Sequence, residues 1–478
     1  MTRPRATIKM QNCEIGMVGL GVMGRNLLLN MADHGHSVAG YDKDAGKTDQ
    51  LREEAETRAV CGASNLREFA GLLRVPRAVI MLVPAGPPVD SVIRDLLPFL
   101  ERGDLVIDGG NSHFSDMDLR TKALAERGIQ FLGVGISGGE HGARHGPSIM
   151  PGGPRDAYER VRPVFESIAA KVNGDPCVAY LGPGSAGHYV KMVHNGIEYG
   201  VMQLIAETYD LMKRGLGATD DKLSAVYGLW DRGELSSYLV EITASIFGQV
   251  DGKTGKRLVD VILDEAAQTG TGMWTSQDAM DMQVPLPTID VAVAMRNLSG
   301  MEKERGEASR AMPPLIRHFG GCGDTFIGQL RDALHAGMII TYAQAMALLA
   351  VASAKREYHL DLEAIARIWR GGCIIRAAVL EDIRGAFRAN SSLPNLLLDP
   401  GLSRKVMTLE ESLRKAVGAA GELGIPAPGL MVSLAYLDGY RSAWSPANLI
   451  QAQRDYFGSH TYERSDAKGV FHTQWEKE

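Results

Sequence analysis

A glycine-rich turn between a short apolar strand and a helix constrains this chain more than any other feature. The apolar run of residues 14–19 leads into Gly19-x-Gly21-x-x-Gly24, and a second apolar strand ends in Asp42. Glycines at these positions permit a tight turn, a close approach of backbone N–H groups to a pyrophosphate, and close helix–strand packing. The following helix N-terminus adds a partial positive charge. The pattern predicts a dinucleotide site, and a purely structural turn is the alternative.

The acid at the end of the second strand bears on the choice of cofactor. Asp42 can accept hydrogen bonds from the adenosine ribose hydroxyls, and its charge would repel a 2′-phosphate. Lys43 would soften that repulsion, but Asp44 follows immediately. We therefore predict that NAD is favoured over NADP, with NADP as the alternative.

Length and charge limit the classes of protein to which the chain can belong. At 478 residues it is too long for one compact core, so two or three domains are expected. The formal net charge of −6 gives no sign of binding to nucleic acid or to an anionic membrane. No apolar run approaches the roughly 20 residues that span a bilayer, and residues 1–12 lack the apolar core of a signal peptide.

Cysteine and histidine usage indicates a reducing compartment and chemistry without a metal. The twelve histidines form no HExxH motif, and the cysteines are odd in number and lack metal-ligand spacing. Scattered thiols of this kind predict a cytoplasmic protein. The five cysteines are Cys13, Cys61, Cys177, Cys322 and Cys373.

Short apolar runs alternate with helical patterns through the first 184 residues. This alternation predicts an α/β domain of the Rossmann type, with a parallel sheet and helices on both faces. Ligands bind such sheets at the carboxyl ends of the strands, where polar loops at 108–112 and 135–142 favour ligand contact over mere turns. The expected strands cover residues 14–19, 37–42, 78–83, 105–109, 130–134 and 177–181.

From about residue 188 to 440 the pattern is helical, with almost no strand signals. Residues 227–233 resemble residues 366–372, and the runs that begin at Val193 and Leu334 resemble each other. These likenesses predict an internally duplicated all-α domain, and coincidence is the alternative.

The remaining residues, from Gly439 on, are rich in polar and aromatic groups and have too little apolar content for an independent core. Such a tail is either disordered or docked on something larger, and its aromatic residues favour docking. We therefore expect a dinucleotide-binding domain at 1–184, an all-helical domain at 185–440 and a C-terminal tail at 441–478.

One helical segment carries an unusual set of polar residues. Lys191, His194, Asn195 and Glu198 stand at i, i+3, i+4 and i+7, so they share one face of a helix with Tyr199 at its margin. A solvated face is the alternative. However, a lysine, an imidazole, an amide and an acid directly after a nucleotide domain differ from the Glu/Lys mixture of a solubilising face, and they predict a catalytic face.

Five separated motifs now stand out, at residues 19–24, 108–112, 137–139, 191–199 and 450–460. Together they cover nearly the whole chain and resemble decarboxylating 6-phosphogluconate dehydrogenases. The resemblance implies oxidation of 6-phosphogluconate, with loss of CO2, to ribulose 5-phosphate in the pentose phosphate pathway. It also implies a homodimer in which the C-terminal tail threads into the partner subunit.

This chemistry suits the residues of the helix face. Hydride leaves C3 of the substrate while a base takes the 3-hydroxyl proton, and the 3-keto acid then loses its carboxylate to give an enediol. Lys191 is the expected base, which requires a lowered pKa. Glu198 is the expected acid that protonates C1 of the enediol, which requires a raised pKa.

The resemblance also assigns binding residues along the chain. Arg454 and His460 would come from the tail of the other subunit, which makes the active site composite. The cofactor would contact Gly19, Leu20, Gly21, Val22, Met23, Gly24, Asp42, Lys43, Asp44, Val83, Pro84, Ala85 and Asn111. The substrate would contact Asn111, Ser137, Gly138, Gly139, His194, Asn195, Tyr199, Thr271, Arg296, Arg454 and His460.

The chain departs from the family pattern at three places. Thr269 stands where a phosphate-binding lysine is usual, which leaves Arg296 and Arg454 as the main carriers of phosphate binding. NADP-dependent members carry Asn-Arg-Thr where this chain has Asp-Lys-Asp at 42–44, in agreement with NAD. A lysine common in the loop after the third expected strand is replaced by the Pro-Ala-Gly of residues 84–86.

Two other functions compete with this interpretation. An NAD-dependent dehydrogenase of another 3-hydroxy acid, such as 3-hydroxyisobutyrate, would share the nucleotide domain and the lysine, but Glu198 and the Arg454/His460 tail argue against it. A non-catalytic dinucleotide sensor would not need Lys191 and Glu198 on one helix face.

Overall fold

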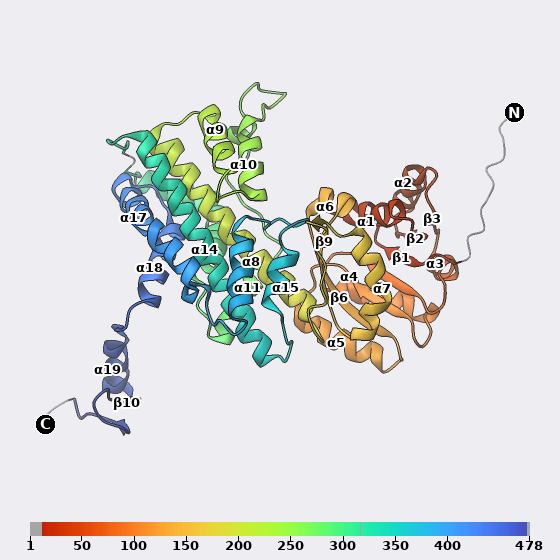
Figure 1. The fold of residues 1–478 in the computed structure, drawn as a ribbon. Helices are drawn as coiled ribbons and strands as arrows, with labels where there is room; N and C mark the ends of the chain where they lie inside the picture. The colour runs from red at the N-terminus through yellow and green to blue at the C-terminus, as the bar shows by residue number, and fades with distance from the viewer. Residues whose placement is uncertain (1–11, 316, 476–478) are drawn as a thin grey trace.

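A computed structural model describes residues 12–315 and 317–475, and these form a sheet domain, a larger helical body and a projecting tail (Figure 1). The N-terminal segment expected to lack a signal peptide, residues 1–12, lies outside the described residues apart from Asn12.

The sheet domain is built on seven strands in the order β3-β2-β1-β4-β5-β6-β7. The first six are parallel, and β7 runs antiparallel to β6. The strands are β1 (Ile15–Val18), β2 (Val38–Tyr41), β3 (Val60–Gly62), β4 (Ala78–Met81), β5 (Leu105–Asp108), β6 (Gln130–Ser137) and β7 (Ser148–Gly152).

Helices cover both faces of this sheet, because alternate residues of each strand point to opposite sides. In β4, Ile80 joins one buried apolar cluster and its neighbour Val79 joins the other. The domain thus has two apolar layers, as a doubly covered sheet requires. Its helices are α1 (Val22–Asp33), α2 (Ala45–Ala55), α3 (Leu66–Leu72), α4 (Pro87–Leu96), α5 (Phe114–Ala125), α6 (Gly139–His145) and α7 (Arg155–Ile168).

Five of the six expected strands are confirmed, with shifted ends. The prediction for 177–181 is wrong, since Val178 forms only an isolated bridge with Ile149. Sequence analysis missed β3 and β7; the parallel sheet with helices on both faces is confirmed, and the antiparallel β7 is added at its edge.

The helical body is organised around two long helices that pack against each other, α8 (Ala186–Asp210) and α14 (Gly323–Lys355). After α8 come α9 (Asp220–Trp230) and α10 (Tyr238–Gly248), and after α14 come α15 (Leu362–Ile368) and α16 (Val379–Ala389). A long helix followed by two shorter ones therefore occurs twice.

The second long helix, α14, is apolar enough by length and composition to cross a membrane, and no other helix in the described ranges is. Since 78% of its most apolar window is buried inside the protein, it is the core helix of the bundle. The remaining helices of the body are α11 (Thr271–Met282), α12 (Pro287–Ser299), α13 (Glu302–Ala311), α17 (Pro400–Leu423) and α18 (Pro428–Tyr440).

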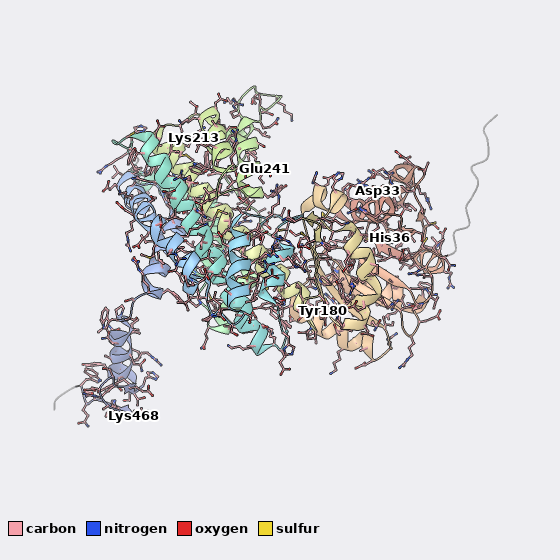
Figure 2. All side chains as sticks on the ribbon, in the orientation of Figure 1. Asp33, His36, Tyr180, Lys213, Glu241 and Lys468 are labelled. Carbon is pink, nitrogen blue, oxygen red and sulfur yellow. The ribbon has the colours of Figure 1, made fainter. Side chains whose placement is uncertain are left out.

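The tail consists of α19 (Ala447–Gly458) and a small antiparallel hairpin of β10 (Tyr462–Glu463) and β11 (Val470–Phe471). It stands away from the helical body, at the opposite end of the molecule from the sheet domain (Figure 1). Lys468 at the tip of the tail lies far from Asp33 and His36 of the sheet domain (Figure 2).

Candidate active site

The glycine-rich turn has the backbone that a bound phosphate requires. Gly19 has a φ of +96°, and a Cβ on Gly24 would lie 1.9 Å from the carbonyl oxygen of Gly19. A Cβ on Gly21 would instead meet no atom within 4 Å, so this side of the turn is open. The helix that follows, α1, is capped by Gly21 without a side-chain hydrogen bond, which leaves its first N–H groups free for an anion.

Asp42 lies at the end of β2 beside this turn, with its side chain mostly buried. One carboxylate oxygen accepts the N–H of Leu20 at 2.8 Å, and the other accepts the N–H of Asp44 at 2.9 Å. The ammonium of Lys47 is 3.7 Å away. Asp44 itself caps α2 by accepting the N–H of Gly46. Asp42 thus lies beside the glycine-rich turn, and Asp44 caps α2.

A buried arginine that sequence analysis missed connects two loops at the carboxyl edge of the sheet. Arg120 donates to the carbonyl oxygen of Gly86, after β4, and to the hydroxyl of Ser112, after β5, both at 3.2 Å. Ser112 in turn donates to Asp108 at 2.6 Å. These contacts hold the loops that carry Val83, Pro84, Ala85 and Asn111.

The predicted face of α8 forms one hydrogen-bonded cluster. The amide oxygen of Asn195 accepts from Lys191 Nζ at 2.7 Å and from His194 Nδ1 at 3.0 Å. His194 Nε2 is 3.0 Å from the hydroxyl of Ser137, at the end of β6. Since an amide oxygen only accepts, Nδ1 of His194 carries the proton and Nε2 accepts from Ser137.

Close packing of β6 on α8 brings these two elements together. A Cβ on Gly135 would lie 2.4 Å from Cβ of Lys191, so this strand position requires glycine. The loop after β6 continues through Gly138 and Gly139, with φ values of +123° and +60°. The sheet domain thus presents Ser137 directly to the helix that carries Lys191, whereas Gly138 lies against the backbone of Gly372 and the space beside Gly139 is open.

Burial shifts the protonation equilibria of the cluster. Lys191 is 6% exposed, and burial lowers its pKa, with a partial opposing effect from the charge of Glu198. Burial raises the pKa of Glu198, an effect that Lys191 and Arg296 oppose. The pKa of His194 is held well below its ordinary value by burial, so its imidazole is neutral.

The helix α11 and the helix α12 supply the opposite wall of the site. Asn195 Nδ2 donates at 3.0 Å to the hydroxyl of Thr271, the first residue of α11. The guanidinium of Arg296 lies 3.5 Å from the centre of the Tyr199 ring and is electrostatically coupled to Glu198. The structure therefore gathers Thr271, Tyr199 and Arg296 around the predicted face of α8.

Other predicted residues lie outside this cluster. Arg454 and His460 are exposed on the tail, which this single chain does not bring to the site. Thr269 is exposed immediately before Gly270, whose φ is +98°.

Sequence analysis also missed residues that line the narrow hollow around Lys191. They are Ser112, His188, Met192 and Trp274, beside the expected Asn111 and Thr271. His188 stands three residues before Lys191 on the same helix face, so its spacing was the available signal.

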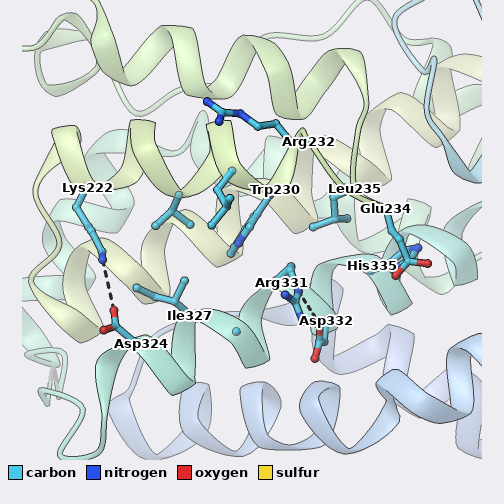
Figure 3. A pocket seen from close by; sticks show the side chains of 14 residues that line it. Lys222, Trp230, Arg232, Glu234, Leu235, Asp324, Ile327, Arg331, Asp332 and His335 are labelled. Atoms are coloured by element: carbon cyan, nitrogen blue, oxygen red, sulfur yellow. Dashed lines mark hydrogen bonds and ion pairs between the residues drawn. The ribbon is translucent and has the colours of Figure 1, made fainter.

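A larger cavity of about 710 Å³ lies elsewhere, between α9 and α14 (Figure 3). Four of its charged side chains form two ion pairs, Lys222 with Asp324 at 3.4 Å and Arg331 with Asp332 at 2.7 Å. With its charges balanced and no contact to the cluster around Lys191, this cavity is separate from the candidate active site.

Comparison with known families agrees with this geometry. Residues 14–182 match the NAD binding domain of 6-phosphogluconate dehydrogenase, and residues 187–475 match the 6-phosphogluconate dehydrogenase C-terminal domain. The chain belongs to the 6-phosphogluconate dehydrogenase family.

Individual family members match over almost their whole length. The NADP(+)-dependent, decarboxylating 6-phosphogluconate dehydrogenase of Bacillus subtilis is 49% identical, over 98% of this chain and 100% of its own. The decarboxylating enzyme of Synechococcus elongatus is 49% identical, over 97% and 99%. The structure of 6-phosphogluconate dehydrogenase from Plasmodium falciparum superimposes with a TM-score of 0.93 at 43% identity, covering 97% of this chain and 100% of that one.

Proposed function

We propose that the chain oxidises and decarboxylates 6-phosphogluconate to ribulose 5-phosphate and CO2, with reduction of a nicotinamide dinucleotide. The observation that carries this proposal is the pairing of the buried Lys191 with the half-buried Glu198 on one face of α8, beside the carboxyl edge of a nucleotide-binding sheet. Membership of the 6-phosphogluconate dehydrogenase family supports the substrate.

The sheet domain fits the dinucleotide. The open face at Gly21 and the uncapped start of α1 suit a pyrophosphate, and Asp42 suits a ribose. When bound, the nicotinamide supplies the acceptor for the hydride that leaves C3 of the substrate.

Lys191 acts as the general base of the oxidation. Its lowered pKa favours the neutral amine, which takes the proton of the 3-hydroxyl group as the C3–H bond breaks. Asn195 fixes the position of Nζ of Lys191 through the 2.7 Å hydrogen bond. His194 beside it is neutral, so it places no second positive charge next to the amine.

Lys191 and Glu198 divide the second half of the reaction. The protonated Lys191 donates a hydrogen bond to the C3 carbonyl oxygen, and this stabilises the enediolate that forms when the C1–C2 bond breaks and CO2 leaves. A metal ion performs this task in other decarboxylases. Glu198, whose pKa is raised by burial, acts in its protonated form and gives a proton to the carbon that lost the carboxylate, which becomes C1 of the product.

Substrate orientation comes from the residues around this pair. Asn111, Ser137, Gly138, Gly139, His194, Asn195, Tyr199 and Thr271 would contact the sugar acid. Arg296 would bind the phosphate as a planar cation, together with Arg454 and His460 of a second copy of the chain. Two features support a composite site in a homodimer: the tail stands away from its own body, and Arg454 and His460 are exposed on it.

The domain limits and the cellular location follow the same proposal. A dinucleotide-binding domain of residues 1–184, a catalytic helical domain of 185–440 and a docking tail of 441–478 would work together in the cytoplasm.

NAD is the preferred cofactor in this proposal. The carboxylate of Asp42 lies beside the glycine-rich turn, and the ammonium of Lys47 is 3.7 Å from it, so a 2′-phosphate would meet a negative charge that one lysine offsets only in part. The Bacillus subtilis relative is named as NADP(+)-dependent, so this preference would distinguish the chain from it.

Both the activity and the preference for NAD can be tested by measuring the steady-state reduction of NAD and of NADP by the purified protein with 6-phosphogluconate. We expect turnover with both cofactors and a higher kcat/KM with NAD. A higher kcat/KM with NADP would refute the role of Asp42, and absence of turnover with either cofactor would refute the activity.

A further inference from the structure

The described part of the C-terminal tail is organised around the buried carboxylate of Asp455. In α19 only Asp455 is buried, with 0% of its side chain exposed, while the residues beside it are exposed. A helix usually buries apolar side chains, and a carboxylate is buried only when hydrogen-bonding partners satisfy it.

Four donors from the chain beyond α19 converge on this carboxylate. One oxygen accepts the N–H of Thr461 at 3.0 Å and Nδ1 of His472 at 2.9 Å. The other accepts the N–H of Thr473 at 3.0 Å and the indole N–H of Trp475 at 2.9 Å. Four donors fill the acceptor capacity of the two oxygens, and each bond is assisted by charge. Asp455 therefore ties both ends of the β10–β11 hairpin to the helix.

The same contacts fix the turn that carries His460. Ser459 and Thr461, on either side of it, have φ values of +51° and +57° in the left-handed region. The N–H of Thr461 is bound by Asp455, and its carbonyl oxygen accepts from Gln451 Nε2 at 2.5 Å. The strained turn is thus held from both sides.

Arg454 belongs to the same unit, since it directly precedes Asp455 on α19. Its guanidinium donates to Gln451 at 3.0 Å, one turn back on the helix. The cation at 454 and the imidazole at 460 are consequently held by one network rather than by separate, flexible segments.

We propose that Asp455 is a positioning residue that preassembles the tail into a rigid hook and sets Arg454 and His460 for the partner's active site. This inference rests on the proposed function, because it gives a structural basis to the tail's contribution. Asp455 would then affect substrate binding through the positions of Arg454 and His460, although its own carboxylate contacts no substrate.

Asp455→Asn in the full-length chain tests the inference. The asparagine removes the charge and turns one acceptor into a donor that faces Thr473, Trp475 or His472. We expect KM for 6-phosphogluconate to rise by roughly 10-fold or more, the scale of lost charge-assisted hydrogen bonds, while kcat changes far less. Hydrogen exchange should show faster exchange of the Thr461 and Thr473 amides.

Asp466→Asn is the matched control, because Asp466 is an exposed carboxylate of the same tail that pairs with Arg464 at 2.6 Å. It should leave KM and both amides unchanged. An unaltered KM in Asp455→Asn, or unaltered exchange at Thr461 and Thr473, would overturn the inference. A wild-type chain that fails to oxidise 6-phosphogluconate would instead refute the proposed function, while the exchange measurement would still test the hook.

Discussion

Asn195→Asp should move the pH dependence of turnover in a direction that identifies the base. The amide oxygen of Asn195 lies 2.7 Å from Nζ of Lys191, so the aspartate places a negative charge in direct contact with the amine. Two unit charges 4 Å apart interact by about 4 kcal/mol at an effective dielectric constant near 20. Since about 1.36 kcal/mol corresponds to one pKa unit, the pKa of Lys191 should rise by about 2 to 3 units once the desolvation of the new carboxylate is subtracted.

The sign of the effect follows from the role of the base. Lys191 must be neutral to take a proton. A raised pKa of Lys191 therefore moves the acidic limb of the pH profile of kcat/KM to higher pH. At neutral pH the variant should lose roughly 100- to 1000-fold in kcat/KM, and it should recover as the pH rises.

The assay is the pH profile of cofactor reduction with 6-phosphogluconate, measured for the wild type, Asn195→Asp and Asn195→Ala. The alanine variant should have lower activity because it loses the contacts to Lys191 and Thr271. It adds no charge, so the acidic limb of its pH profile should lie within one pH unit of the wild-type limb. An Asn195→Asp profile that keeps the wild-type limb would refute Lys191 as the base.

Two further substitutions test the role of Glu198 as the acid and the role of Asp42 in cofactor selection. Glu198→Gln should lower kcat by roughly 100- to 10,000-fold, yet a rapid-mixing measurement should still show a first burst of reduced cofactor, because oxidation precedes the step that needs the acid. Asp42→Asn should shift the ratio of kcat/KM values toward NADP by roughly 10-fold or more, because the repulsion of a 2′-phosphate is removed.

Controls for these two variants come from the same segments. Asp44→Asn keeps the charge of Asp42 and alters an exposed cap of α2, so the preference for NAD should persist. Loss of the burst in Glu198→Gln would place Glu198 in the oxidation step, and an unchanged cofactor ratio in Asp42→Asn would remove Asp42 from cofactor selection.

The polar face of α8 could be predicted from the sequence because its periodicity is local. Lys191, His194 and Asn195 do share one face of α8, and Lys191 and His194 both donate a hydrogen bond to the amide oxygen of Asn195. Their bonds to Ser137 and Thr271 cross between elements far apart in the chain, and only the family motifs indicated those partners.

Features that depend on tertiary contacts were harder to predict. β7 contains a proline and a glycine, so its composition gives no strand signal, and it pairs only because β6 lies beside it. The apolar run at 177–181 reads as a strand but forms a single bridge to Ile149, since propensity is overridden by the available partners. Asp455 looks like an ordinary surface acid until the hairpin folds back over it.

The stoichiometry of CO2 release to cofactor reduction tests the central claim most directly. Purified chain would turn over a limiting amount of 6-phosphogluconate with excess NAD in the presence of a metal chelator, and both products would be quantified. We expect one CO2 for each reduced cofactor, because the roles proposed for Lys191 and Glu198 complete the decarboxylation without a metal. Reduced cofactor without CO2 would contradict this conclusion and would identify a simple hydroxy acid dehydrogenase.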